Sequence, residues 1–250
     1  MSSDLKQTTS QLTEDELEKI DDEVEAARDV WNIPDDEPMR NWLHEHQPER
    51  WSFWKNAAEN GHAGAQWLMG LCYADEAGVD HDEEKALAWF IKAAEHGDVA
   101  AQFLLGSAYD QGDGVIQDER EAAVWYRKAA EQGDSDAQFI LGLMYENGRG
   151  VEKDELEAVD WFLKAAEQGD AEAQCNLGFM SEDGRGVKQD DCDAVAWYRK
   201  AAEQGLAEAQ FSLATMFEDG QGVVQDEREA AVWYTRQPSR AMRTRSISLP

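Results

Sequence analysis

The sequence is poor in the features that secretion, membrane insertion and nucleic-acid binding require. Only 23 of its 250 residues are Lys or Arg, against 53 Asp or Glu, which gives a formal net charge of −30. Nucleic acids and anionic membranes attract basic surfaces, so we expect neither as a partner. No apolar run is long enough for a transmembrane helix. The N-terminus "MSSDLKQTTSQLTEDELEK" has neither the basic start nor the apolar stretch of a signal peptide.

Cysteine is also scarce. Cys72, Cys175 and Cys192 are too few for a disulfide framework and indicate reduced thiols. We therefore expect a cytoplasmic protein without membrane insertion. Two interpretations of the acidic charge remain open: it attracts a basic partner, or it forms only a well-solvated surface.

What the sequence does contain is a strict internal repeat. A step of 36 residues separates recurring Ala-Gln pairs, recurring glycines and recurring tryptophans. The Ala-Gln pairs begin at Ala65, Ala101, Ala137, Ala173 and Ala209. The glycines are Gly61, Gly97, Gly133, Gly169 and Gly205, and the tryptophans are Trp89, Trp125, Trp161, Trp197 and Trp233. Such a period is the sequence signature of a repeat architecture.

Each repeat unit predicts two helices. The stretch "DAQFILGLMYE" (136–146) places apolar residues on one helical face, and the glycines of "NGRGV" (147–151) allow the chain to reverse. Asp154 and Glu157 then form the capping box of a second helix. One helix pair cannot bury its own apolar face, so we expect an all-α fold, an α-solenoid of about five 36-residue helix-turn-helix repeats.

These residues also carry a family resemblance. The pattern "AEAQ…LG…GxGV…WY.KAAEQGD" resembles the Sel-one-like repeat family, a branch of the tetratricopeptide-like superfamily. The resemblance covers residues 61–234 and implies a right-handed superhelix. A degenerate half-repeat, "ERWSFWKNAAENG", precedes it, and the first unit has Glu76 where the others have the first loop glycine.

The chain thus divides into four expected segments. Residues 1–37 form an acidic N-terminal segment with one amphipathic helix, whose apolar stripe includes Ile20 and Val24. Residues 38–60 form the degenerate half-repeat or cap, residues 61–234 the solenoid, and residues 235–250 an irregular basic tail. Three uses of the N-terminal helix stay open: it caps the first unit, docks on a partner, or occupies the groove as an autoinhibitor.

No set of residues typical of catalysis or of a metal or cofactor site is legible. His44 and His46 do not share a helix face. "SFWK" (52–55) lacks the motifs that accompany an acyl-enzyme serine, and the "GxGV" loops follow helices and lack the Lys-Ser/Thr of a P-loop. The acidic loop 110–119 does not match EF-hand spacing. We expect no metal, no cofactor and no enzymatic activity.

The resemblance to tetratricopeptide-like arrays implies that the first helix of each pair lines a concave groove. The matching positions form an apolar, aromatic strip bordered by carboxylates, and the phenylalanines and carboxylates have two open interpretations. They bind a partner, or the rings pack only between helices and the carboxylates are solvated. The predicted groove residues are Trp67, Leu71, Phe103, Asp110, Asp136, Phe139, Leu143, Glu146, Glu172, Phe179, Glu182 and Phe211.

The expected function is that of a non-catalytic adaptor or scaffold that binds a protein or peptide in this groove. The acidic rim favours a ligand with basic residues beside apolar ones. An accessory regulatory subunit of an enzyme or signalling complex is the alternative. A hydrolase is less favoured, because no nucleophile–base pair is legible.

The C-terminal tail breaks the repeat. The phrase "WYRKAAEQG" occurs at 125–133 and at 197–205, but the chain continues after Tyr234 as "TRQPSRAMRTRSISLP". The tail was therefore translated in a shifted reading frame, in which the third base of each codon joins the first two bases of the next. With synonymous codons chosen freely, this frame can encode "KAAEQGDADAQYILA". This matches "KAAEQGLAEAQFSLA", one period earlier, at 11 of 15 positions. We interpret the tail as the product of a one-base deletion near codon 235; a basic docking tail is the alternative.

Genomic DNA tests the deletion hypothesis. We expect the shifted frame downstream of codon 250 to encode further repeats of the same period. A downstream frame without repeats would reject it. If the hypothesis holds, the last helix pair lacks the polar cap that a solenoid end needs, and self-association through this end is expected.

Overall fold

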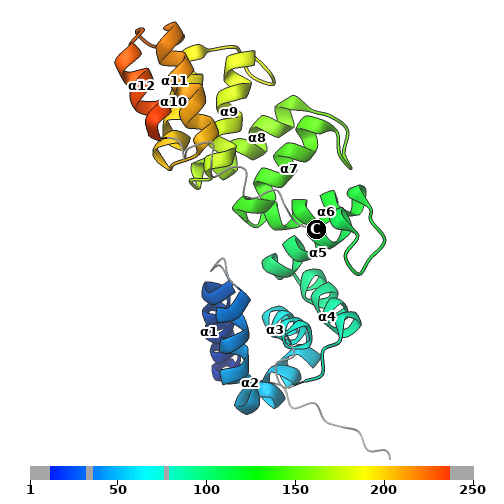
Figure 1. Cartoon of the computed structure of the whole chain (residues 1–250). Helices are drawn as coiled ribbons and strands as arrows, with labels where there is room; N and C mark the ends of the chain where they lie inside the picture. The colour runs from blue at the N-terminus through cyan, green and yellow to red at the C-terminus, as the bar shows by residue number, and fades with distance from the viewer. Residues whose placement is uncertain (1–11, 32–35, 76–78, 237–250) are drawn as a thin grey trace, which may run out of the picture. The chain divides into compact units, whose positions relative to one another are not determined.

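The computed structural model describes residues 12–31, 36–75 and 79–236, and all regular structure in these ranges is helical, as the sequence predicts (Figure 1). The basic tail from residue 237 and the loop position of Glu76 lie outside the described residues. The helices are α1 (Glu14–Trp31), α2 (Asp36–Glu59), α3 (Ala63–Ala74), α4 (Glu83–Glu95), α5 (Val99–Gln111), α6 (Glu119–Glu131), α7 (Ser135–Asn147), α8 (Glu155–Glu167), α9 (Ala171–Asp183), α10 (Asp191–Glu203), α11 (Ala207–Asp219) and α12 (Glu227–Arg236). Contacts divide the chain into unit 1, Met1–Lys128, and unit 2, Ala129–Pro250.

Helix α1 covers the start of the repeat array in unit 1. Its stripe of Ile20, Val24 and Ala27 is buried against α2 and α3. Val24 packs directly on Gly64, where an added Cβ would lie 2.7 Å from the Val24 Cγ2. Arg28 Nη2 donates to Asp98 Oδ2 at 2.7 Å, which joins α1 to the N-cap of α5. These contacts are those of a helix that caps the first repeat.

Within each helix pair, an aromatic ring of the second helix packs against a glycine of the first. A Cβ added at Gly142 would lie 2.6 Å from Cε1 of Phe162, and one at Gly178 would lie 2.5 Å from Tyr198. The glycine of each "LG" dipeptide therefore sets how closely the two helices approach. Gly70 with Phe90 and Gly106 with Tyr126 repeat the contact in unit 1.

Successive helix pairs are joined by the glutamine of each "AQ" dipeptide. Gln138 is buried; its Nε2 donates to the Ala130 carbonyl at the end of α6, 3.0 Å away. Its Oε1 accepts from Gln168 Nε2, in the C-cap of α8, at 2.8 Å. One side chain thus ties its own helix to the preceding helix and to the end of its partner helix. Gln174 makes the same two bonds one period later.

The turns have the backbone geometry that their glycines predict. Gly148 has φ +70° and ends α7 in the left-handed conformation, and Gly150 has φ +66°. Asp154 then caps α8, because its Oδ1 accepts from the Glu157 amide at 3.2 Å. Both glycines are needed here because residues with a Cβ adopt positive φ at a cost.

Replacing Gly142 with alanine tests the ring-on-glycine contact. Phe162 is fully buried and its ring has no room to move aside. Overpacking costs about 1–3 kcal/mol, and alanine gains roughly 1 kcal/mol over glycine in a helix. A mid-range cost of about 2 kcal/mol leaves a net loss, so we expect Gly142→Ala to lower the free energy of unfolding by about 1 kcal/mol in urea denaturation followed by circular dichroism.

The matched control is Glu167→Ala, an exposed position on α8, which should change stability by less than about 0.5 kcal/mol. Equal or greater stability of Gly142→Ala would contradict the assignment of this glycine to helix spacing.

Candidate functional site

The predicted groove residues of unit 1 do not form an open strip. Trp67 and Leu71 are fully buried, with exposures of 0% and 1%. Arg28 of α1 lies over the Trp67 ring, 5.8 Å from its centroid. Because α1 and α2 pack against α3, these two side chains belong to the core of unit 1. Phe103 and Asp110 of α5 are half-buried.

The predicted phenylalanines of unit 2 lie at the surface of the first helices. Phe139 and Phe179 are half-buried, whereas Phe211 on α11 is 55% exposed. Each ring leans on an aromatic ring of the second helix in its own pair. The ring centroids are 5.9 Å apart for Phe139 and Phe162, 5.2 Å for Phe179 and Tyr198, and 5.7 Å for Phe211 and Tyr234. The rings are therefore held in place on one side.

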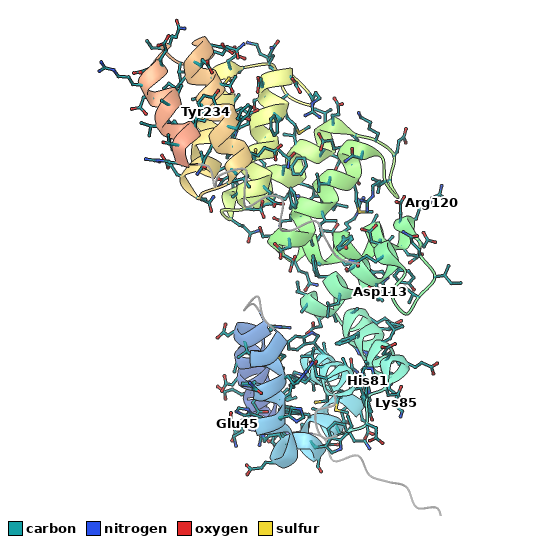
Figure 2. All side chains as sticks on the ribbon, viewed as in Figure 1. Glu45, His81, Lys85, Asp113, Arg120 and Tyr234 are labelled. Carbon is teal, nitrogen blue, oxygen red and sulfur yellow. The ribbon has the colours of Figure 1, made fainter. Side chains whose placement is uncertain are left out.

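Tyr234, labelled on α12 in Figure 2, is oriented by two hydrogen bonds. Its hydroxyl donates to Glu218 Oε2 at 2.8 Å and lies 3.3 Å from the Thr215 hydroxyl oxygen. The last helix pair has Ala214 in place of the glycine that the other pairs use for ring contact. Tyr234 is half-buried, whereas Tyr198 is fully buried in a core that includes residues of the following helix α11. Phe211 and Tyr234 thus form the most accessible of the three ring pairs of unit 2 described above.

The predicted rim carboxylates are partly committed to contacts within the fold. Glu182 Oε2 accepts from the Tyr198 hydroxyl at 2.7 Å. Burial and this hydrogen bond raise the pKa of Tyr198, so the phenol stays protonated. Phe162 has no hydroxyl at the equivalent position, and Glu146 instead pairs with Arg185 of the next loop.

The other predicted residues of unit 2 are accessible. Asp136 and Glu172 are exposed, and Leu143 is half-buried. Sequence reasoning missed Arg185, Tyr198 and the joining glutamines. The available signal was the recurrence of tyrosine 16 residues after an acidic residue, as in Glu182 with Tyr198 and Glu218 with Tyr234.

This face offers apolar ring surface and negative charge, and little reactive chemistry. In the described parts of the chain, no group of three or more His, Cys, Asp or Glu side chains is placed to hold a metal ion. Burial raises the pKa of the Cys175 and Cys72 thiols to about 12, so neither forms the nucleophilic thiolate at neutral pH. None of the helices described has the length and apolar character to cross a membrane.

Thiol alkylation tests the placement of the cysteines. Cys192 is exposed, whereas Cys72 and Cys175 are buried. At pH 8 we expect iodoacetamide to modify Cys192 of the native protein at least tenfold faster than the other two, because alkylation needs an accessible thiolate. Mass spectrometry of peptides from native and urea-denatured samples measures this. Rapid labelling of Cys175 in the native protein would contradict its burial.

The model of the Sel1 repeat matches residues 63–98, 99–134, 135–170, 171–206 and 207–236. No curated protein sequence matches the chain.

Two solved structures are similar over most of the chain. One is a protective antigen of uropathogenic Escherichia coli with an SLR fold, at 32% identity and a TM-score of 0.70, covering 90% of this chain and 48% of that one. The other is a Sel1 repeat protein from Oxalobacter formigenes, at 34% identity and a TM-score of 0.69, covering 80% and 87%. The chain thus spans about half the length of the antigen. Sel1 repeat proteins are generally non-catalytic scaffolds for protein–protein interaction. With five consecutive matches that span residues 63–236, the chain belongs to the Sel1 repeat family.

Proposed function

We propose that the protein is a non-catalytic adaptor or scaffold that binds a protein or peptide partner on the first helices of unit 2. The observation that carries this proposal is Phe211, a phenylalanine that is 55% exposed yet held against Tyr234 at a centroid distance of 5.7 Å. A large ring that is already fixed loses little conformational freedom on binding. Such rings are favoured anchors at interfaces.

The charge around the ring suggests the chemistry of the partner. Glu208 on α11 and Glu172 on α9 are exposed acids of the same first helices. The whole chain carries a formal charge of −30. This potential speeds association with a basic partner and opposes acidic ones. A segment with Lys or Arg beside apolar residues fits both the ring and the surrounding acids.

The reactive groups near this face support binding rather than catalysis. The Tyr198 phenol is hydrogen-bonded to Glu182, and the Cys175 thiol is buried with a raised pKa. Neither group is poised as a nucleophile at neutral pH. The exposed carboxylates of Asp136, Glu172 and Glu208 can attract cationic groups. None of the contacts described above pairs them with a nucleophile or with a second acid–base group.

Replacing Phe211 tests the proposal. The tagged protein is used to capture partners from a lysate of its host. Each captured partner is then purified and titrated against wild-type protein and Phe211→Ser by calorimetry. Removing an anchor ring typically costs 1–3 kcal/mol, so we expect affinity to fall by roughly 10- to 100-fold.

The control is Leu156→Ser on α8, which removes an apolar side chain of 67% exposure from a second helix. It should leave partner affinity unchanged. Equal losses in both variants, or no loss in Phe211→Ser, would place the binding surface elsewhere.

A further inference from the structure

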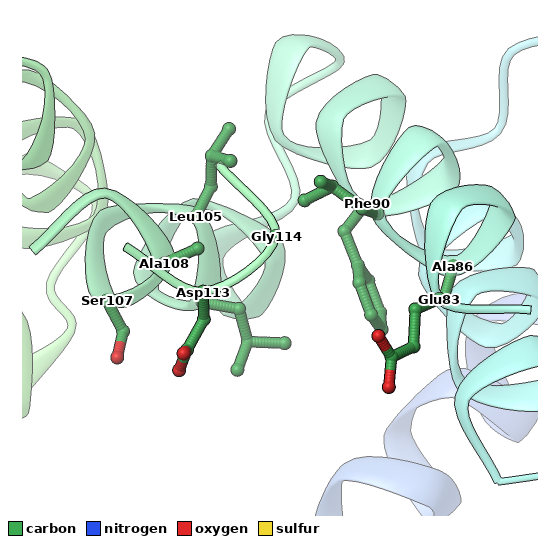
Figure 3. Close-up of a pocket in the computed structure, with 10 residues that line it drawn as sticks. Glu83, Ala86, Phe90, Leu105, Ser107, Ala108, Asp113 and Gly114 are labelled. Atoms are coloured by element: carbon green, nitrogen blue, oxygen red, sulfur yellow. The ribbon is translucent and has the colours of Figure 1, made fainter. Parts of the chain in front are cut away.

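Unit 1 contains an open cavity between α4 and α5 that the proposed binding face does not include. Its volume is about 420 Å³, within the range of ligand pockets. Leu87, Phe90 and Leu104 give it an apolar lining. In Figure 3, Glu83 and Phe90 of α4 border one side of the cavity, while Asp113 and Ser107 border the other.

The loop after α5, which borders the cavity, contacts α4 less closely than the equivalent loops contact α8 and α10. Gly114, Gly186 and Gly222 occupy the same loop position, because multiples of 36 residues separate them, and their φ angles lie between +64° and +68°. A Cβ added at Gly186 or Gly222 would collide with the backbone carbonyl at the start of α8 or α10. At Gly114 the only neighbour within 4 Å would be Leu87 Cδ2, at 3.2 Å. The loops that contain Gly186 and Gly222 are thus closed onto the starts of α8 and α10, whereas the loop that contains Gly114 has no such contact with the start of α4.

The charge of this loop is also reversed. Arg185 occupies the equivalent position in the loop after α9, where it pairs with Glu146 and with Asp183 at 3.2 Å. The loop after α5 has the exposed Asp113 at this position, and Ala74 replaces the acidic partner. The guanidinium of Arg185, which pairs with two carboxylates of the fold, is therefore replaced at this position by the carboxylate of Asp113, which borders the cavity.

We propose that this cavity, which we call the Asp113 pocket, binds an arginine side chain of a protein partner. The Asp113 pocket consists of Glu83, Leu87, Phe90, Leu104, Ser107 and Asp113. Its apolar lining accommodates the aliphatic stem, and Phe90 offers a ring face for the guanidinium. Asp113 and Glu83 supply carboxylates. The Glu83 side chain is 88% exposed, and its Oε1 lies 3.4 Å from His81 Nε2. Arginine fits better than lysine, because its planar guanidinium stacks on aromatic rings and can donate two parallel hydrogen bonds to one carboxylate.

This inference rests on the proposed function, because a pocket for a partner's arginine has a use only in a protein that binds partners. It adds a second contact point, in unit 1, and names the residue type that the contact requires.

The test is a titration of the isotope-labelled full chain with the peptide acetyl-Leu-Arg-Leu-amide, followed by NMR. We expect saturable shifts of the Ser107, Asp113 and Gly114 amide signals. The same peptide with citrulline in place of arginine keeps the shape and loses the charge. Its affinity should be about tenfold lower, as expected for loss of one charge-assisted hydrogen bond.

Variants of the chain complete the test. Asp113→Asn should weaken the arginine peptide by about tenfold, and Leu87→Phe, which fills the cavity, should weaken both peptides. The matched control is Asp191→Asn. Asp191 stands where Glu83 does, but at α10, where the loop with Gly222 is closed. It should bind the arginine peptide as wild type does.

Equal affinity for the arginine and citrulline peptides would overturn the proposal, as would full affinity in Asp113→Asn. If no shifts appear at the pocket while Phe211→Ser still loses its partner, the Asp113 pocket is rejected and the adaptor function stands. If the arginine peptide binds at the pocket but Phe211→Ser keeps its partner, the pocket stands and the proposed face on unit 2 is rejected.

Discussion

The repeat array depends on one buried amide side chain in each helix pair. Gln138 bonds to the Ala130 carbonyl of the preceding helix and to Gln168 of its own partner helix, so it fixes two helix junctions at once. A buried amide that lost these partners would destabilise the folded state, because its polar atoms would be desolvated without hydrogen bonds. The two bonds therefore favour one particular spacing of successive helix pairs. In the first repeat His96 replaces the second glutamine, with Nδ1 2.7 Å from Gln66 Oε1. In the last, Gln210 Oε1 has no hydrogen-bond partner among the described residues.

The repeats are nearly identical, so a position whose residue differs from its equivalents in the other repeats is easily identified. Asp113 reverses the charge of a loop position that Arg185 uses for internal pairing. Ala214 interrupts the series of ring-packing glycines. The ring of Tyr234 is half-buried, as is that of Phe90, whereas Tyr126, Phe162 and Tyr198 are buried. Asp113 is exposed beside the Asp113 pocket, whereas Ala214 is fully buried in the core of the last helix pair.

The acidic residues of the chain have two roles. Several carboxylates are used inside the fold, where Asp154 caps a helix and Glu182 accepts a hydrogen bond from Tyr198. Others, such as Asp136 and Glu172, remain exposed and set the sign of the surface potential. The negative potential at the surface therefore depends on which carboxylates are exposed and which are hydrogen-bonded within the fold.

The sequence by itself determined the helix pairs, their period and their turns. Helix caps and left-handed glycines are local, so Asp154 and Gly148 are legible without any tertiary contact. Only the tertiary structure decided which predicted groove residues reach solvent, because α1 and α2 pack against α3, where Trp67 and Leu71 are buried. It also decided that Glu182 is engaged and that the loop at Gly114 stands open, since both depend on distances between segments that periodicity does not encode.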